Sequence, residues 1–423
     1  MNTGLRAIPA LLLCMGAAPA FSAGFQLLEQ NASGLGNAYA GSAAVAENAS
    51  TIFYNPAGMS FLKGTQVSAG LTVVKPNFQF NNNGSLNPTA MGGTPATGGT
   101  SDAGNVGYLP NAYLSMPVNK DLSVGLGLGA PFGLMTEYSP GWAGQFQSVK
   151  FDIRTQNINP SVAWRVNDKL SLGFGVDWMR ITAQYVKSTV VPTGLSSPYP
   201  PYASVPASVD LAGDAWGWNA GLMYQVADGM RIGLSYRSTV LQKTTGTASA
   251  GPAAGTASAD VKLPDTWILS VYQVLNDRWD VMGDISRTGW SSIPQLVISS
   301  SLSPAPDALN LQFKNTWRVA FGGTYKYTDQ WKLKFGIAYD QTPVPDASVR
   351  PASMPDNDRW WLSLGAQYRL SPAAVVDVGY THLFLKDADI ANNGSGNQAT
   401  KGLISGSYSD SADILGVQYS QSF

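Results

Sequence analysis

Residues able to carry acid–base or covalent chemistry are few in this sequence. Its one histidine, His382, stands in "YTHLFLKD" toward the end of a strand-like pattern, and a lone histidine is more often structural than catalytic. The chain has no Gly-x-Ser-x-Gly elbow, no His-Glu-x-x-His motif and no cluster of metal-ligating residues. The sequence therefore predicts no enzyme, no metal site and no cofactor.

A glycine run, "GLGLGAPFG", superficially resembles a dinucleotide-binding loop. It lacks the Gly-x-Gly-x-x-Gly spacing and no helix follows, so glycine alternating within a strand explains it better. Gly125, Gly127 and Gly129 could face inward so that another segment approaches the wall. Alternatively, these glycines with Pro131 could weaken strand pairing and open a gap, because proline cannot donate to the ladder. The pattern leaves both interpretations open.

A stiff turn, "YNPAG", lies just before the first strand-like segment. Asn55, Pro56 and Ala57 combine a polar tip with a fixed backbone angle, and almost no charge surrounds them. Such a turn fixes the path of the chain where it meets the next element.

The composition narrows the class of protein. Of 423 residues only 13% are charged, against about 25% in typical soluble domains, while 11% are aromatic and 45 are glycine. The net charge is -1 and basic residues form no run or patch, which argues against a nucleic-acid partner.

The N-terminus has the pattern of a secretory signal. Arg6 precedes the apolar residues 7–20, and Ala20 and Ser22 form a small-x-small cleavage site, so the mature chain should begin at Ala23. The single cysteine lies inside this signal, and no later run of 18 apolar residues suggests a membrane helix. The sequence predicts an exported protein without disulfides.

Segments of about ten residues that alternate apolar with small or polar positions fill the rest of the chain. In "WKLKFGIAYD" Trp331, Phe335 and Tyr339 share one face with the other odd positions. This alternation is typical of a tilted strand crossing a bilayer. The pattern predicts about fourteen strands, near residues 65–75, 107–118, 121–130, 149–166, 169–187, 208–226, 229–242, 260–274, 277–290, 310–327, 331–342, 357–370, 373–386 and 412–423.

The connections between these strands alternate in length. Short ones such as "VNKD", "LNDR" and "YTDQ" carry Asn or Asp turn chemistry. The long ones span residues 76–106, 131–148, 188–207, 243–259, 291–309, 343–356 and 387–411. This order is typical of an all-β outer-membrane barrel with short periplasmic turns, long extracellular loops and both termini in the periplasm. A soluble β-sandwich explains it less well, and the last strand, ending on Phe423, resembles an outer-membrane assembly signature.

A barrel of this size encloses a lumen that wall side chains alone do not fill. Residues 23–64 are small and rich in glycine, and the simplest interpretation is that they fill the lumen as a compact plug. We therefore expect a signal peptide at residues 1–22, an N-terminal hatch (plug) in the lumen at residues 23–64, and a transmembrane β-barrel at residues 65–423.

Few cations are placed to meet an anionic ligand in the lumen. In "WRVAF" the apolar neighbours of Arg318 would face lipid, so Arg318 would face inward. Arg154, Arg180 and Lys187 are further candidates on strands of ambiguous register. Each either holds a carboxylate or pairs with a luminal acid, since an unpaired buried charge is costly.

Several stretches resemble the FadL long-chain fatty acid transporters and their toluene and xylene uptake relatives. These stretches are "AGFQLLEQNASGLGNAYAG", "YNPAGM", "APFGLMTEYSPGWAGQFQSVKFDIRTQNINPSVAWRV", "LPDTWILSVYQ", "TPVPDASVRPASMPDNDRWWLSLGAQYRL" and "VVDVGYTH". The resemblance implies a monomeric fourteen-stranded barrel in the outer membrane of a Gram-negative bacterium, surrounded by lipid and lipopolysaccharide. It implies passive transport of hydrophobic molecules: capture at outer loops, binding in an interior pocket, and sideways exit at a kink in the third strand.

The resemblance also places the parts of that route. It puts Phe25 near the pocket, the hatch turn at Asn55, Pro56 and Ala57, and the kink within residues 125–133, which end at Gly133. The region before "FKNTWRVAFG" lacks a lysine expected of a fatty-acid transporter. Long-chain fatty acids are therefore the first expectation and aromatic hydrocarbons the alternative, while a general diffusion porin fits the low charge and the plug less well.

Overall fold

The computed structural model describes residues 24–98, 101–194 and 200–423, and the predicted signal peptide lies outside the described residues. Within them the chain forms one closed antiparallel sheet whose wall is crossed fourteen times, and five crossings consist of two consecutive strands. In chain order the wall contains β1 (Gln66–Asn82), β3 (Gly107–Pro117), β4 and β5 (Leu122–Gly129, Gly133–Glu137), β6 (Lys150–Arg165), β7 (Leu170–Pro192), β8 (Tyr202–Ala227), β9 and β10 (Met230–Arg237, Val240–Ala250), β11 and β12 (Ala253–Leu263, Thr266–Val274), β13 and β14 (Trp279–Thr288, Gln295–Ser300), β15 and β16 (Ser303–Asn310, Thr316–Lys326), β17 (Trp331–Asp340), β18 (Arg359–Ser371), β19 (Ala374–Leu385) and β21 (Ile404–Ser422). Shorter elements are β2 (Ser101–Asp102), β20 (Ala388–Asn392), the helical turns α2 (Thr51–Tyr54) and α3 (Gln398–Lys401), and the 3-10 turns η2 (Leu35–Asn37), η3 (Pro56–Phe61), η4 (Thr89–Met91) and η5 (Trp290–Ser292).

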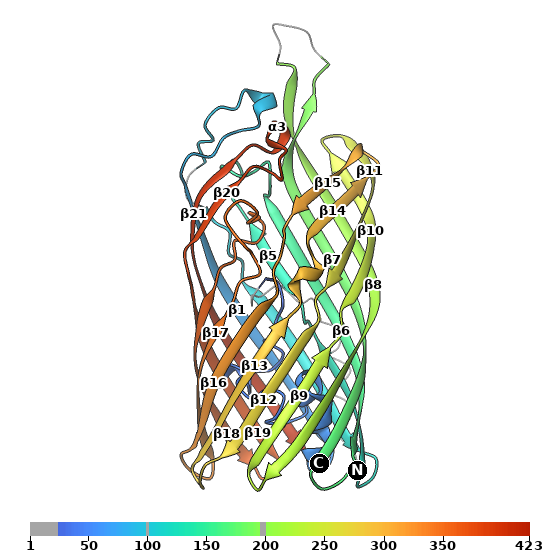
Figure 1. Cartoon of the computed structure of the whole chain (residues 1–423), viewed down its shortest axis with the longest axis vertical. Helices are drawn as coiled ribbons and strands as arrows, with labels where there is room; N and C mark the ends of the chain where they lie inside the picture. The colour runs from blue at the N-terminus through green and yellow to red at the C-terminus, as the bar shows by residue number, and fades with distance from the viewer. Residues whose placement is uncertain (1–23, 99–100, 195–199) are drawn as a thin grey trace.

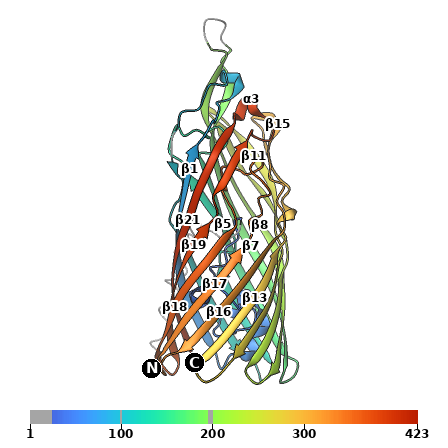
Figure 2. The same cartoon turned by 60° about the vertical axis from the view of Figure 1, so that its left-hand side comes forward.

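The sheet closes because the last strand pairs with the first. β21 and β1 run in register from Gln66 opposite Ser422 to Asn82 opposite Gly406, and Figure 2 shows them side by side. Connections are short at the end where the C-terminus lies and longer at the other end (Figure 1). We call these the periplasmic and extracellular ends. The predicted barrel of about fourteen strands is confirmed.

Several predicted loops are wrong in their bounds, because strands continue into them. β7 and β8 stay paired up to Pro192 opposite Tyr202, so most of the predicted loop 188–207 is strand. β10 pairs with β11, and β14 with β15, inside the predicted loops 243–259 and 291–309. Beyond the lipid layer neither face of a strand has to be apolar, which removes the alternation on which the prediction depended.

Alternation within the wall separates a lipid face from a lumen face. On β16 Trp317, Val319 and Phe321 are 47%, 52% and 60% exposed, whereas Arg318 between them is 5% exposed. The outward side chains therefore form an apolar band, and the inward ones meet the contents of the lumen.

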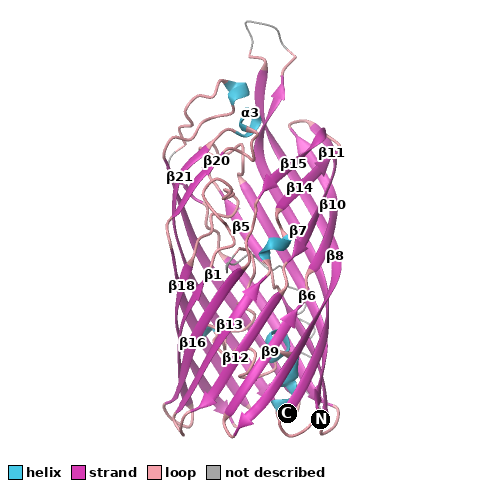
Figure 3. Cartoon of the chain, in the orientation of Figure 1, coloured by secondary structure: helices cyan, strands magenta, loops and turns pink. Residues whose placement is uncertain are grey.

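Helices have a small part in this fold. Within the described ranges no helix is long and apolar enough to cross a membrane. The helices are short, with three to six residues each, and lie inside the barrel or on its loops (Figure 3).

Candidate functional site

The N-terminal residues 24–65, which we call the hatch, lie inside the periplasmic half of the barrel (Figures 1 and 3). Glycines on nine crossings of the wall let the hatch approach closely, with its backbone at six of them and with side chains at the other three. At Gly336, for example, an added Cβ would stand 2.1 Å from the carbonyl carbon of Asn37. The wall glycines that face the hatch in this way are Gly125, Gly173, Gly221, Gly233, Gly322, Gly336, Gly365, Gly379 and Gly416. We call them the glycine collar.

The predicted hatch turn joins the hatch to the wall through hydrogen bonds. Asn55 is completely buried; its side-chain oxygen accepts from the backbone N–H of Ala57 at 3.1 Å and so caps η3. Its amide group donates to the carbonyl of Ala43 at 2.7 Å and to that of Leu222 on β8 at 3.0 Å. Pro56 occupies the first position of η3, where its missing N–H costs nothing.

Replacing Asn55 should loosen the hatch without removing the barrel from the membrane. Asn55→Ala leaves the carbonyls of Ala43 and Leu222 unpaired and removes the cap, which should cost about 2–3 kcal/mol of hatch docking. We expect impaired uptake at an equal surface level of protein. The check is ligand uptake by cells with matched amounts of heat-modifiable barrel; unchanged uptake by Asn55→Ala would refute a role for the turn.

A buried ion-pair network ties the hatch to the wall. Lys334 on β17 is 3% exposed and its Nζ lies 2.8 Å from Glu47 of the hatch, 2.9 Å from Asp377 on β19 and 2.9 Å from the carbonyl of Ser33. The amide of Gln367 donates to both carboxylates. We call this set the latch.

Removing the central cation should destabilise the hatch strongly. Lys334→Met leaves two buried carboxylates without their counter-charge, at a cost of about 3–5 kcal/mol. Lys332 is the matched control, because it is 28% exposed and 3.5 Å from Glu47, so Lys332→Met should cost less than about 1 kcal/mol. Thermal unfolding and protease access to the hatch in detergent would measure both; equal effects would contradict the latch.

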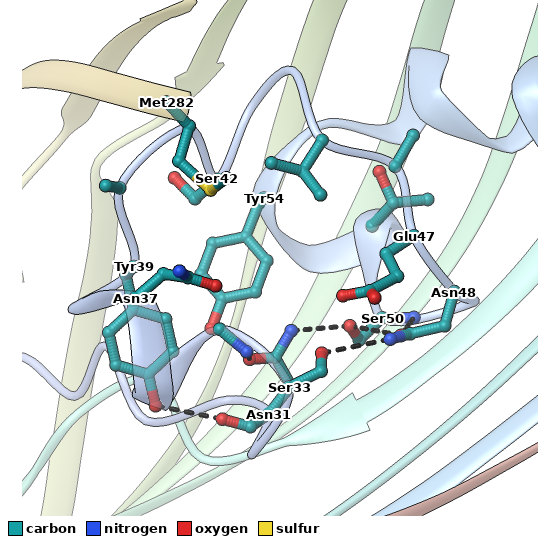
Figure 4. A pocket seen from close by; sticks show the side chains of 15 residues that line it. Asn31, Ser33, Asn37, Tyr39, Ser42, Glu47, Asn48, Ser50, Tyr54 and Met282 are labelled. Atoms are coloured by element: carbon teal, nitrogen blue, oxygen red, sulfur yellow. Dashed lines mark hydrogen bonds between the residues drawn. The ribbon is translucent and has the colours of Figure 1, made fainter. Parts of the chain in front are cut away.

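The hatch itself leaves little room for a ligand. Figure 4 shows a cavity of about 40 Å³, lined by polar side chains of the hatch that bond one another and by apolar residues, among them Val45 and Met282 of β13. Asn31 donates to Ser50 at 2.6 Å and Asn48 donates to Ser33 at 2.9 Å. Nearby in the hatch, burial raises the pKa of Glu29 to about 8, so its carboxyl group is protonated at neutral pH. This packed, polar interior is suited to sealing the lumen.

The third wall crossing contains a bulge. Three residues separate Gly129 of β4 from Gly133 of β5, whereas two separate their partners on β6, Asn157 and Arg154. The extra residue, in the segment that contains Pro131, reverses which side chains face inward. Each interpretation of the glycine run corresponds to one feature of the structure. Gly125 and Gly129 face inward and contact the hatch, and the wall crossing is interrupted in the segment that contains Pro131.

The wall is unpaired on one side of this bulge. β3 and β4 pair only up to Ala112 opposite Leu128, although β3 continues to pair with β1 as far as Gly107 opposite Val74. β5 pairs with β6. Toward the first loop, among the described residues, an isolated bridge joins Thr136 to Gly104, and the N–H of Glu137 donates to the carbonyl of Ala103 at 3.1 Å. In the described part of the chain, a gap therefore lies between β3 and β5.

The first residues of the hatch cover this gap from inside. Gln26 forms an antiparallel bridge with Phe132; the N–H of Leu27 donates to the carbonyl of Pro131 at 2.8 Å, and the N–H of Gly133 donates to the carbonyl of Phe25 at 2.9 Å. The hatch side chain of Gln30 adds two bonds to the backbone of Ala130. The N-terminal segment thus acts as a short extra strand against the bulge.

Above the hatch, the lumen is apolar. Phe25 packs against Phe132 and Trp290, with ring centroids 5.9 and 4.9 Å apart, and Trp290 packs against Phe313 at 6.1 Å. These four rings are buried and pack against one another, and we call the apolar cluster that they form with their neighbours the chamber. Its further buried residues include Leu134, Ile153, Met179, Ile181, Val240, Leu263, Leu311, Val344 and Met354. This lining suits a hydrophobic ligand.

The three predicted arginines do not gather around the chamber. Arg318 faces inward as expected, but it donates to the carbonyl of Ala38 at 2.5 Å, lies 3.6 Å from Asp284 and stacks 5.0 Å from the ring of Trp361, so it holds the hatch. Arg154 and Arg180 point out of the barrel and pair with aspartates there. The structure therefore does not bring these three residues to Phe25.

A pair of lysines, one of them the predicted candidate Lys187, lies beside the chamber. Lys187 on β7 and Lys401 on α3 share one acid, Asp307 of β15, with Lys401 at 2.6 Å. Tyr185, part of the apolar lining, lies below Lys187, 5.8 Å from ring centroid to Nζ. Alternation along β7 indicates that Lys187 faces inward. Lys401 lies in a loop, and no local sequence pattern indicates that this loop brings it next to Asp307.

The chain's single histidine lies away from all of this. His382 points outward from β19, with its Nδ1 2.8 Å from a carboxylate oxygen of Asp413 that also accepts from Tyr380. In the described residues no group of three His, Cys, Asp or Glu could hold a metal ion.

A closed antiparallel barrel that contains residues 24–65 beneath an apolar chamber defines a class: outer-membrane transport proteins for hydrophobic compounds. The family described as "Outer membrane protein transport protein (OMPP1/FadL/TodX)" matches residues 13–423, and this chain belongs to that family. It is thus a protein of the Gram-negative outer membrane.

Relatives and solved structures agree with this assignment. The chain is 36% identical to Outer membrane protein P1 of Haemophilus influenzae over 408 residues, which cover 88% of each chain. It is 31% identical to the long-chain fatty acid transport protein of Escherichia coli (strain K12) over 405 residues, 86% of this chain and 88% of that one. The crystal structure of a Pseudomonas aeruginosa FadL homologue superposes with a TM-score of 0.87 at 26% identity, covering 95% of this chain and 100% of that one. The Pseudomonas putida toluene transporter TodX, at a TM-score of 0.71 and 18% identity, covers 95% and 100% and shows the same fold.

Proposed function

We propose that this protein carries long-chain fatty acids passively across the outer leaflet, from the extracellular loops through the chamber and sideways into lipid. The observation that carries this proposal is the gap between β3 and β5, which the wall leaves open and residues 25–27 cover. When that segment withdraws, the chamber opens toward the bilayer.

Sideways exit agrees with the energetics of the ligand. Each buried methylene group contributes about 0.8 kcal/mol, so a sixteen-carbon chain gains on the order of 10 kcal/mol on leaving water. Release into the aqueous periplasm would forfeit this gain, and the packed hatch stands in that path. Lateral release into lipid keeps it, and no energy source is required.

The lysine pair favours an anionic ligand over a neutral one. Lys187 and Lys401 carry two positive charges against the single charge of Asp307, which leaves a net positive charge beside an apolar chamber. A fatty-acid carboxylate would compensate that charge while its chain lies among the rings. The second candidate is an aromatic hydrocarbon such as toluene, which the four rings around Phe25 would also accommodate.

Competition between the two ligand classes tests this proposal. Cells whose only transporter for hydrophobic compounds is this protein would receive labelled oleate with and without excess toluene. We expect saturable oleate uptake that toluene does not inhibit, and weaker uptake with Lys187→Met. Background oleate uptake with entry of toluene would instead assign the protein to hydrocarbon transport.

A further inference from the structure

Glu29 is a carboxylic acid in the interior of the hatch. Its side chain is completely buried, and within the described residues neither carboxylate oxygen accepts a hydrogen bond from another residue. Buried polar groups in folded proteins are almost always hydrogen-bonded. An ionised Glu29 would therefore lack the donors that a buried carboxylate requires, so the docked hatch favours the neutral acid.

Two tyrosines of the hatch lie close enough to Glu29 for its charge to act on them, but their hydroxyl groups bond elsewhere. The hydroxyl of Tyr39 donates to the carbonyl of Asn31 at 2.9 Å, and that of Tyr54 donates to the carbonyl of Leu28 at 2.7 Å. Both carbonyls belong to the same segment as Glu29. The tyrosines thus fix the backbone on either side of the acid without solvating its carboxyl group.

The charges of the barrel that face Glu29 include more acids than bases. Arg318 of β16 and Arg359 of β18 act on its carboxyl group, and each already has another carboxylate within 4.0 Å. The acids that surround the two arginines are Asp284, Asp340 and Asp356. Ionisation of Glu29 would place a fourth carboxylate against two guanidinium groups in a buried site. Because a buried charge without its own counter-charge is unfavourable, this arrangement also favours the neutral acid.

Docking of the hatch is therefore linked to the binding of one proton. Burial raises the pKa of Glu29 from an ordinary value of 4.5 to about 8, against the opposing charges of Arg318 and Arg359. The docked hatch thus binds a proton that an exposed Glu29 releases well below neutral pH. Docking should be strongest below about pH 5 and should weaken roughly tenfold per pH unit up to about pH 8.

The segment that contains Glu29 also covers the gap in the wall. Gln26 forms the bridge with Phe132, and the side chain of Gln30 bonds the backbone of the same bulge. Arg318, in contrast, lies on β16, halfway round the wall from β4. This segment therefore joins the gap to the opposite wall, so a change at Glu29 is transmitted directly to the residues that cover the gap.

We propose that the proton on Glu29 controls the gate: the neutral acid holds residues 25–27 against the gap between β3 and β5, and loss of the proton releases them. This inference rests on the proposed function, which assigns the gate to those residues. Release exposes the carboxylate to water, where it needs no buried partner. The switch depends only on the hatch and the wall, so it operates whether the ligand is anionic or neutral.

Thiol labelling at the gate tests this proposal in the absence of ligand. Gln26→Cys would place the only cysteine in the predicted mature chain, and its reaction with a maleimide in proteoliposomes would be compared with that of Gln26→Cys/Glu29→Gln. At each pH the ratio of the two rates cancels the titration of the thiol itself. We expect this ratio to increase at least about tenfold from about pH 5.5 to about pH 7.5, because the glutamine has no proton to release.

Two further variants separate the role of the proton from a structural role. Glu29→Asp keeps a titrating carboxyl group, so its labelling relative to Glu29→Gln should still increase with pH. Glu47→Gln is the control for a second carboxylate of the hatch. Although burial opposes the shift, the charges of Lys334 and Lys332 lower the pKa of Glu47 to about 2, so its removal should leave the pH dependence unchanged. A constant ratio across this pH range, or loss of the pH dependence with Glu47→Gln, would overturn the proposal.

Failure of the proposed function would give a different result. If the labelling ratio increases with pH but oleate does not enter the cells, the fatty-acid assignment fails and the control of the gate by Glu29 stands. If oleate uptake is saturable but the ratio stays constant, the fatty-acid assignment stands and the control by Glu29 fails.

Discussion

A single side chain added to the glycine collar should turn this sealed barrel into an open pore. In Gly336→Val the new Cβ would lie 2.1 Å from the carbonyl carbon of Asn37 and 2.5 Å from the backbone nitrogen of Ala38. Backbone atoms on both sides cannot move without shifting η2 and the strand. We expect the hatch to be displaced while the barrel, whose fourteen crossings close without the hatch, still assembles.

Liposome swelling with small sugars would measure the effect. The wild type should swell slowly, and Gly336→Val at least about tenfold faster, because a wall of fourteen strands encloses a channel wide enough for water. Gly323→Val is the matched control: Gly323 points outward, and its nearest neighbour, the carbonyl oxygen of Asp280, would be 3.8 Å from an added Cβ. Slow swelling by Gly336→Val, with normal assembly, would show that the collar does not seat the hatch. Fast swelling by the wild type would favour a diffusion porin.

Within the lipid band the polar side chains face the lumen, whereas above it they face outward. This change explains for which residues the sequence predicted the correct face of the strand. Arg318 lies within the lipid band, where apolar neighbours face outward, so alternation placed it inward correctly. Arg154 and Arg180 lie above that band, where the apolar residues Ile153 and Ile181 face the chamber and the charges face out. In an alternating pattern the apolar residues therefore face outward on the half of a strand within the lipid band, and they face inward on the half above it.

The candidate site was predictable only where it is local in sequence. The glycine run and Pro131 identified the broken crossing, and the turn at Asn55 identified the hatch contact, because each depends on a few consecutive residues. The latch joins Glu47 to Lys334, and the lysine pair joins Lys187 to a loop, so both depend on pairings between distant segments. Alternation indicates which face of a strand each side chain occupies, but it does not indicate the pairing register, which decides which residues of distant segments lie side by side.

A disulfide across the gap should stop transport reversibly if the ligand leaves sideways. Gln26 and Phe132 form a non-hydrogen-bonded antiparallel pair, flanked by the bonds from Leu27 to Pro131 and from Gly133 to Phe25. Such pairs have Cα atoms about 4.5 Å apart, within the range that a disulfide spans. The one native cysteine lies in the predicted signal peptide, so Gln26→Cys/Phe132→Cys would place the only two cysteines in the mature chain.

Oxidised Gln26→Cys/Phe132→Cys should show oleate uptake reduced at least about tenfold, and a reductant should restore it to the level of the reduced variant, because breaking the bond frees residues 25–27 again. Ser68→Cys/Ser420→Cys provides the control bond. Their hydroxyl oxygens lie 2.9 Å apart between β1 and β21, away from the gap, so that crosslink should leave uptake unchanged. If the crosslink at residue 26 forms quantitatively and uptake continues, the ligand does not pass between β3 and β5, and the path must lead through the hatch instead. A dependence of uptake on this one bond would identify the N-terminal segment as the gate, since the latch and the glycine collar hold the rest of the hatch in both states.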